Sequence, residues 1–403
     1  MRICKIWDAD YPWDIRVEKI SNSLAMAGHE VHLVCRNEAR RQKTEWNGRF
    51  TIHRLPVFPD FADPIKTLWN FPFAFNPIWI HSIAQVVRDT QADLILVRDI
   101  LLALPAVILG RFFQIPVILD MAENYPAMLR DRIRYTPTGR LAALIRHPSN
   151  ALVVECVALK FVDHVIVVVE ESRERLVHKG VPWERISVVG NTPKLDQWLQ
   201  VERALQRATP QREMNLVYLG NLDGSRGVDV AIRAVEFLKR IGRLVRLSII
   251  GDGPCIQELR NLASKLSVED RVLITGRLPW ARIEAIMAKA HVGIIPHYVT
   301  DAWNSTIPNK LFDYMCMGLP VIVSDAKPTA RIVQAERCGE VFRDRNPEDL
   351  ARCVLLLENP ELCKREGCAG KVAVRERYNW ERDSQVLVKV VQNARRSGSR
   401  LTQ

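Results

Sequence analysis

The sequence lacks the features of a disulfide or zinc scaffold. Its nine cysteines form no C-x-x-C pair, and several lie within stretches that predict strands or helices, such as Cys4, Cys35 and Cys316. Thiols placed in this way are typical of small buried apolar side chains. We therefore expect reduced cysteines and no structural metal held by them.

Long apolar runs are missing as well. Charged residues follow Met1 too closely for a signal peptide, and the most apolar stretches, 100–110 and 151–169, are interrupted by Pro105 or by several charged side chains. Neither stretch is suited to span a bilayer. The sequence therefore predicts a cytoplasmic protein.

Signals for metal and nucleic acid are weak too. Asp8 and Asp10 have D-x-D spacing, but they directly follow the first predicted strand. The net charge of +11 is accompanied by no aromatic-plus-glycine RNA motif and no helix-turn-helix pattern. We expect no bound metal, no cofactor and no nucleic-acid partner.

The chain does contain alternating apolar strands and helices. It has 403 residues, 48% of them apolar and 26% charged, which is enough for two complete cores. Strands are predicted at 3–7, 31–35, 50–55, 94–97, 117–120, 165–169, 186–189, 216–219, 247–250, 272–275, 292–295, 321–323 and 340–342. Such strands, linked by helices, predict an α/β protein with two doubly wound Rossmann-like domains facing across a cleft.

A polar stretch at 191–214 divides these domains. We expect a first domain at 1–195 and a second at 212–380, with a final helix, 381–403, packing back on the first. The carboxyl ends of parallel strands are where ligands bind in open α/β sheets. The cleft between the domains is therefore the expected place for a site.

The run from Ser305 to Ser324, S-T-I-P-N-K-L-F-D-Y-M-C-M-G-L-P-V-I-V-S, is the most informative segment. Pro308 predicts the start of a helix and Gly318 its end. Free backbone N–H groups, the positive end of a helix dipole and a cation together favour phosphate, and the residues that would provide them are Ser305, Thr306, Asn309 and Lys310. Asp313 is placed to accept hydrogen bonds from ribose hydroxyls. The alternative is an ordinary amphipathic helix with a chance cap.

Three further loops follow predicted strands of the second domain. The first, G-N-L-D-G-S-R-G at 220–227, contains Gly220 and Asn221 and brings Arg226 as a second cation for a diphosphate. The others are 251–254, which starts at Gly251, and 276–280, where Arg277 and its neighbours would line a base pocket. The alternative is that these glycines serve turn geometry alone.

The order of these motifs, ending in P-N-K-L-F-D-Y-M-C-M-G-L-P-V-I, resembles the family 4 retaining glycosyltransferases with the glycosyltransferase B fold. The resemblance covers about 1–378, more loosely in the first half, where D-I-R-V-E-K-I-S-N-S-L-A resembles the first helix of the family. It implies a nucleotide-diphosphate sugar as donor, with uridine favoured and guanosine second. It also implies that Asp313 binds ribose, that Arg226 binds diphosphate, and that acceptor binding involves Asp14, Arg16 and Asn124.

The sequence departs from the family pattern at three positions. Ser305 stands where the family has a glutamate that contacts the donor sugar, and Asn221 stands where it often has an arginine. Lys310 is the expected replacement cation or sugar contact. A loop histidine is replaced by D-M-A-E-N-Y-P, in which Asp120 and Glu123 would hold the acceptor hydroxyl or support the leaving group, or else cap a helix. We therefore take the catalytic candidates to be Asp120, Glu123, Arg226 and Lys310.

Positive charge gathers between Arg130 and Arg146, where five arginines face one acid, Asp131. Aromatic residues gather between Phe58 and Trp79. Both segments favour peripheral contact with an anionic membrane, unless the arginines are a solvated surface and the aromatics are core.

The favoured function is a metal-independent glycosyltransferase that builds a bacterial-type surface polysaccharide on a glycan or lipid-linked acceptor. The alternatives are a sugar-nucleotide epimerase and a non-catalytic nucleotide-binding protein.

Overall fold

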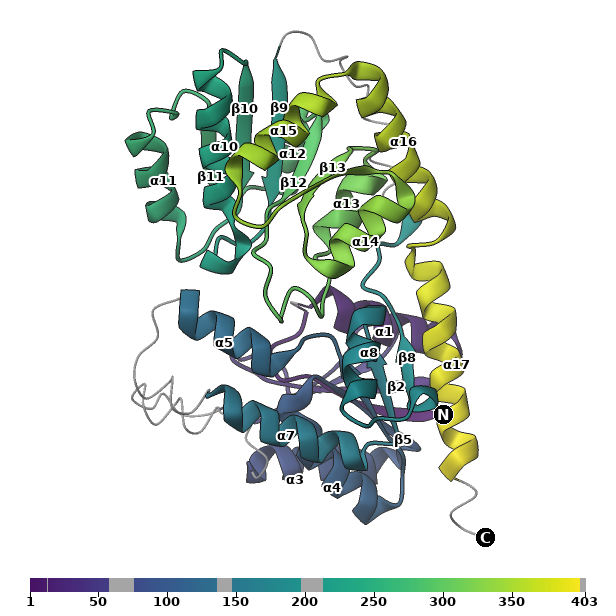
Figure 1. The fold of residues 1–403 in the computed structure, drawn as a ribbon. Coiled ribbons are helices and arrows are strands. Elements are labelled where there is room, and N and C mark those ends of the chain that lie inside the picture. Colours follow the sequence, from purple (N-terminus) through teal and green to yellow (C-terminus); the bar gives the residue numbers. More distant parts are fainter. Residues whose placement is uncertain (13, 58–75, 136–146, 197–212, 399–403) are drawn as a thin grey trace. The chain divides into compact units, whose positions relative to one another are not determined.

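The structure is a computed structural model that describes residues 1–12, 14–57, 76–135, 147–196 and 213–398 (Figure 1). It divides into two compact units. The first consists of Met1–Arg130, Gly139–Gly190 and Asp383–Gln403, and the second of Asp131–Thr138 and Asn191–Arg382. The end of the final helix is thus grouped with the first unit.

The first unit contains an eight-stranded sheet in the order β3-β4-β2-β1-β5-β6-β7-β8. Its strands are β1 Arg2–Ile6, β2 Glu30–Cys35, β3 Thr44–Trp46, β4 Thr51–Arg54, β5 Leu94–Arg98, β6 Val117–Met121, β7 His164–Val167 and β8 Ile186–Val188. All neighbours are parallel except β3 and β4. The short edge strand β3 was not predicted, because a polar three-residue segment has no strand periodicity to detect.

The helices of the first unit cover both faces of this sheet. They are α1 Ile15–Met26, α3 Pro77–Thr90, α4 Ala103–Phe113, α5 Tyr125–Tyr135, α7 Pro148–Phe161 and α8 Glu170–His178. Side chains of α3, α4 and α7 share one core with alternate residues of β1 and β5, such as Cys4 and Ile95. Helix α1 begins at the Asp14 cap, whose carboxylate accepts from the Val17 N–H at 2.8 Å.

Trp79 corrects part of the membrane hypothesis. It lies in α3 on one stripe with Ile83 and Val87 and is 1% exposed within the core of the first unit. Residues 58–75, the rest of the aromatic segment, lie outside the described residues. In the described part of the chain, no helix is both long enough and apolar enough to cross a membrane.

The second unit contains a six-stranded parallel sheet in the order β11-β10-β9-β12-β13-β14. Its strands are β9 Met214–Leu219, β10 Val245–Ile250, β11 Val272–Gly276, β12 Val292–Ile295, β13 Val321–Ser324 and β14 Gly339–Phe342. The strand order reverses between β9 and β12. Ligands of doubly wound sheets bind at this switch point, beyond the carboxyl ends of the strands.

Helices again alternate with these strands. They are α10 Val228–Arg240, α11 Ile256–Lys265, α12 Trp280–Lys289, α13 Lys310–Cys316, α14 Lys327–Glu336, α15 Pro347–Leu357 and α16 Pro360–Glu376. The final helix, α17 Trp380–Gly398, begins in the second unit, and its residues from Asp383 onward are grouped with the first. The prediction of two doubly wound α/β domains is confirmed. Helix α13 begins two residues later than Pro308 predicted, because the Leu311 and Phe312 N–H groups first bond to the carbonyls three residues back.

Candidate functional site

One candidate site is built on the loop that follows β9. The short helix Gly224–Arg226 is capped by Asp223, which accepts hydrogen bonds from the Ser225 N–H at 3.1 Å and from its hydroxyl at 2.7 Å. Arg226 Nε donates to the other Asp223 oxygen at 3.0 Å. Gly227 closes the loop with φ of 62°, and a Cβ there would come within 1.9 Å of the Pro296 carbonyl oxygen. The loop therefore needs glycine and holds Arg226 in place.

The second cation, Lys310, is the first residue of α13. The residue is 7% exposed, and its Nζ lies 3.9 Å from the centre of the Tyr218 ring and 3.4 Å from His297 Nε2. A Cβ on Gly220 would come within 2.7 Å of this Nζ. The glycine that follows β9 therefore provides the space in which the ammonium group lies.

Two aromatic side chains hold the cations in a fixed arrangement. The centroid of the His297 ring lies 4.0 Å from that of Trp303, and the Arg226 guanidinium lies 4.5 Å from the centroid of Trp303. Trp303 Nε1 also donates to Ser225 Oγ at 3.4 Å. Five residues, which we call the cation cluster, thus contact one another beyond the ends of β9 and β12: Tyr218, Arg226, His297, Trp303 and Lys310.

The electrostatics of the cation cluster favour an anion. Burial, and then repulsion from Arg226, lowers the pKa of Lys310 well below its usual value, and burial with the neighbouring cations lowers the pKa of His297. Among the described residues, no carboxylate forms an ion pair with Lys310. Asp223, the partner of Arg226, is partly exposed. An anionic ligand would supply a counter-charge for buried Lys310 and add to the one that Asp223 gives the partly buried Arg226.

The remaining predicted residues of the second unit lie in different environments. Ser305 is buried, and its hydroxyl donates to the Asp301 carbonyl at 2.6 Å, so this hydroxyl already has a partner within the protein. Arg277 pairs with Asp252 at 3.4 Å and has a side chain 88% exposed, outside the cation cluster. The others are buried Thr306, exposed Asn221 and Asn309, half-buried Asp313, and Gly251, whose added Cβ would clash with the Gly220 carbonyl.

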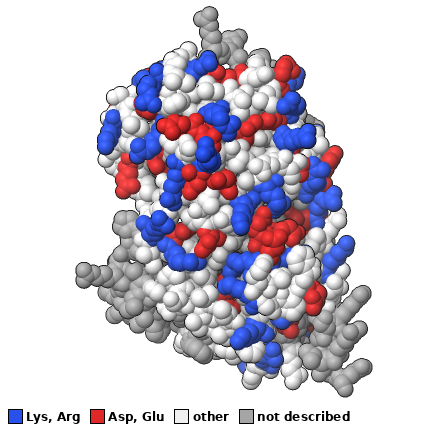
Figure 2. Space-filling view, in the orientation of Figure 1, with Lys and Arg blue, Asp and Glu red and all other residues white. Residues whose placement is uncertain are grey.

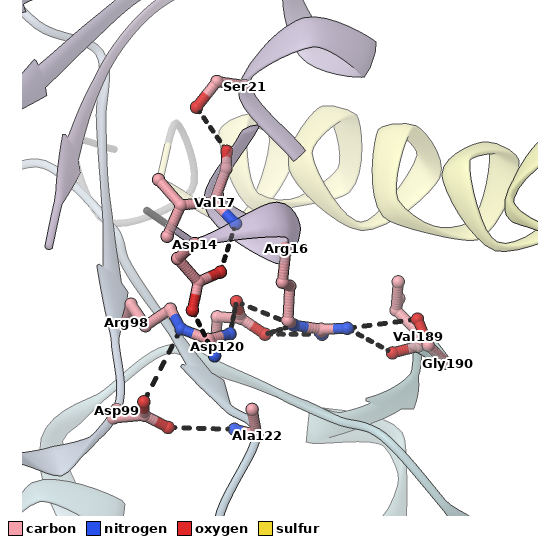
Figure 3. A network of polar contacts seen from close by, with 10 residues as sticks. All are labelled: Asp14, Arg16, Val17, Ser21, Arg98, Asp99, Asp120, Ala122, Val189 and Gly190. Carbon is pink, nitrogen blue, oxygen red and sulfur yellow. Dashed lines mark hydrogen bonds and ion pairs between the residues drawn. The ribbon is translucent and has the colours of Figure 1, made fainter. Parts of the chain in front are cut away.

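Three predicted residues of the first unit, Asp14, Arg16 and Asp120, belong to one network of polar contacts (Figure 3). Asp120 is fully buried and accepts hydrogen bonds from Arg16 Nη2 at 2.6 Å and from Arg16 Nε at 3.1 Å. Arg98 Nη1 lies 3.5 Å from the same carboxylate. Burial alone would raise the pKa of Asp120, but Arg16 and Arg98 together lower it to about 2.

Two further predicted residues, Arg16 and Asp14, take part in this network. Arg16 is 2% exposed and also donates to the carbonyls of Val189 and Gly190, while Asp14 caps α1 and bonds Arg98 at 3.2 Å. These contacts connect the start of α1 to the carboxyl ends of β5 and β6 and to the segment that follows β8.

The two predicted residues beyond β6 take different positions. Asn124 is buried, and its Oδ1 accepts from the Ala127 N–H at 3.4 Å, so its side chain caps the first turn of α5. Glu123 is half-buried. The catalytic roles of Glu123 and Asp120 stay predictions.

Sequence reasoning missed several members of these clusters. Asp99 has φ of 57°, accepts from the Ala122 N–H at 3.1 Å, and has a pKa that burial raises to about 6. Lys5 is fully buried in β1, which lowers its pKa to about 8. Lys5 and Asp99 lie within or next to apolar strands, so the sequence pattern gives no sign of their contacts. His297 was detectable, because it is a polar residue two positions beyond β12. Among the described residues, no three His, Cys, Asp or Glu side chains gather to hold a metal ion.

Comparison with known proteins identifies the family. The model described as "Glycosyl transferases group 1" matches residues 213–359, and the model described as "Glycosyl transferase 4-like domain" matches residues 14–192. The two models together cover most of the chain, which therefore belongs to the family 4 glycosyltransferases.

Individual relatives are distant. An uncharacterized glycosyltransferase of Methanocaldococcus jannaschii is 23% identical over 53% of this chain and 51% of its own length. The putative colanic acid biosynthesis glycosyltransferase WcaL of Salmonella typhimurium is 28% identical over 44% of this chain and 43% of its own. The chain thus spans about half the length of these curated relatives.

Solved structures share the fold over nearly the whole chain. Sucrose-phosphate synthase from Thermosynechococcus elongatus has a TM-score of 0.77 at 18% identity and covers 98% of both chains. Anabaena HepE in complex with UDP-glucose has a TM-score of 0.70 at 13% identity and covers 98% of this chain and 100% of its own. These similarities confirm the glycosyltransferase B fold.

Proposed function

We propose that the protein is a retaining glycosyltransferase that takes its sugar from a nucleotide-diphosphate sugar, with a UDP-sugar favoured and a GDP-sugar second. The observation that carries this proposal is the cation cluster. Buried Lys310 and partly buried Arg226 meet at the switch point of a doubly wound sheet, where a diphosphate would complete their charge. The complex of HepE with UDP-glucose, on the same fold, supports this choice.

The proposed chemistry needs stabilisation of a leaving diphosphate more than it needs a protein nucleophile. Lys310 and Arg226 would neutralise charge as the sugar–phosphate bond breaks, and the aromatic pair would keep them fixed before the reaction. Asp313, half-buried in α13, would accept hydrogen bonds from the ribose. Glu123 would hold the acceptor hydroxyl. In this scheme the sugar keeps its anomeric configuration, because the acceptor attacks from the face that the diphosphate leaves.

For the acceptor we propose a glycan or a lipid-linked glycan in surface polysaccharide biosynthesis. The names of two relatives support this class, the putative colanic acid glycosyltransferase WcaL and the amylovoran biosynthesis glycosyltransferase AmsK of Erwinia amylovora. We further propose contact with an anionic membrane near the acceptor. Of the basic segment expected to make it, Arg130, Arg132 and Arg134 are exposed on α5, whereas Arg140 and Arg146 lie outside the described residues.

A ligand and product test distinguishes the proposed activity from its alternatives. Calorimetry with UDP, GDP, ADP and uridine should show tight binding only for a diphosphate, and UDP-glucose should release UDP faster when a glycan acceptor is present. An epimerase would convert the sugar without an acceptor, and a non-catalytic protein would bind without turnover. Equal affinity for UDP and uridine would refute the diphosphate site.

A further inference from the structure

Helix α7 has an apolar outer face. Leu152, Val153, Val157 and Phe161 recur at helical spacing on it and are between 37% and 63% exposed, while Ala158 and Leu159 on the opposite side are buried in the core. Single exposed apolar residues are ordinary, but a whole stripe of them is not. The exposed apolar stripe of α7 therefore indicates an interaction surface.

The neighbouring helix α4 continues this surface. Its Ile108 and Phe112 are 44% and 73% exposed, and α4 packs directly against α7 within the first unit. The Arg111 guanidinium lies 5.7 Å from the centroid of the Phe161 ring and so connects the exposed sides of the two helices. We call the six exposed apolar residues of the two helices the α4–α7 face.

Helix α3, which packs on the other side of α4, provides an internal comparison. Its exposed residues are polar or charged, with His81, Gln85, Arg88 and Asp89 on the outside. The apolar surface is therefore a property of α4 and α7 and not of the whole helical layer. In Figure 2 the region that α7 occupies in Figure 1 is largely white, with basic residues beside it.

Exposed charge on α4 and α7 themselves has one sign, while exposed Asp163 and Glu184 line the same pocket as Arg111 and Phe161. The exposed charged residues of the two helices are Arg111 and Lys160. Their one acid, Glu155, is fully buried and is paired with Arg175 at 2.9 Å and with Lys179. An apolar face bordered by cations, and with no exposed acid of its own, complements an anionic lipid bilayer.

We propose that the α4–α7 face is the membrane-contact surface of this protein and that it binds anionic bilayers in the interface plane. The apolar side chains would enter the headgroup region, while Arg111 and Lys160 would contact lipid phosphates. The inference deepens the proposed function, because it assigns the surface by which the enzyme would reach a membrane-linked acceptor. It differs from contact through the basic segment 130–146, which needs no apolar insertion.

Vesicle flotation tests the proposal with the full chain. Wild type should float with vesicles of phosphatidylglycerol and phosphatidylcholine at low salt and much less with phosphatidylcholine alone. Val153→Ser with Val157→Ser should lower the partition coefficient at least about tenfold, because apolar area no longer leaves water. Lys160→Gln should lower it about fivefold on anionic vesicles only, which corresponds to about 1 kcal/mol per cation.

Matched variants make each outcome decisive. Ile241→Ser with Leu244→Ser removes two similarly exposed apolar residues of the second unit and should leave flotation unchanged. If only a variant with Arg130, Arg132 and Arg134 changed to Ser loses binding, the basic segment is the contact and the α4–α7 face is not. If wild type is a dimer in lipid-free buffer and the valine double variant is a monomer that floats equally well, a second copy covers the face, which also overturns the proposal.

Nucleotide binding by the same variants separates this inference from the proposed function. The valine variants lie far in the sequence from the cation cluster and should bind UDP as wild type does. Loss of flotation with normal UDP affinity supports the α4–α7 face. Normal flotation of a protein that binds no nucleotide would overturn the proposed function and leave the membrane surface in place.

Discussion

Replacing Lys310 with Met should have opposite effects on the ligand-free protein and on its complex. The ammonium group is buried, and its described neighbours are the Tyr218 ring at 3.9 Å and His297 Nε2 at 3.4 Å. The cation–π contact of a charged Lys310 contributes about 0.5–2 kcal/mol, whereas burying this side chain without an ion pair costs on the order of several kcal/mol, through desolvation of the charge or through loss of its proton. Met fills similar space without charge. We therefore expect the free energy of unfolding of the ligand-free variant to be unchanged or higher.

The complex should lose affinity instead. A hydrogen bond between a cation and phosphate contributes about 1.5–3 kcal/mol, so the Kd for UDP should rise roughly 10- to 150-fold. Uridine, which has no phosphate, should bind both proteins equally. Lys310→Arg should recover only part of the affinity, because its planar fork does not fit the space beside Gly220 that the lysine occupies.

Two measurements test this pair of effects. Urea unfolding gives the free energy of unfolding without ligand, and calorimetry with UDP and with uridine gives the affinities. Lys289→Met, which removes an exposed lysine of α12, serves as the control and should change neither quantity. A Lys310→Met variant that is less stable by several kcal/mol, or that binds UDP as wild type does, would refute the role of Lys310 in the cation cluster.

Three further predictions follow from the same contacts. The pKa values of Lys310 and His297 are both lowered, so binding of UDP should be accompanied by uptake of a proton. The calorimetric enthalpy of binding should then depend on the ionisation enthalpy of the buffer, and an equal enthalpy in all buffers would contradict this prediction. Asp120→Asn should lower the free energy of unfolding by about 3–5 kcal/mol in urea, because Arg16 and Arg98 stay buried without their counter-charge. Since its folded pKa of about 2 lies below the unfolded value of about 3.9, the wild-type stabilisation should persist at neutral pH and disappear only as pH falls from about 4 towards 2, and unchanged stability of the variant at neutral pH would refute the network. Asp313→Ala should weaken UDP binding without changing the melting temperature, and an unchanged Kd would remove Asp313 from the site.

The sequence by itself determined the architecture and two of the five residues of the cation cluster, Arg226 and Lys310. Strands and helices alternate with enough apolar periodicity to locate them, because both signals are local. Lys310 and Arg226 were detectable for the same reason. Arg226 lies in the loop that follows a predicted strand, and Lys310 lies near the start of a predicted helix. Local signals did not give the boundaries of the helices to the residue. Helix α13 begins at Lys310, two residues after the predicted start, because a turn with hydrogen bonds to the carbonyls three residues back precedes it.

Only the tertiary structure decided what these residues contact. The sequence identified Asp120 only as a carboxylate at the end of a strand, whereas the structure shows that Arg16, 104 residues away in the sequence, binds it in the interior. His297 and Trp303 gained a role only when folding placed them between Lys310 and Arg226. The tertiary structure also decided that the α4–α7 face is exposed, since apolar periodicity does not tell which side of a helix a neighbour covers. Contacts between distant segments fix burial, and burial fixes whether a charged or apolar side chain stabilises the fold or faces a ligand.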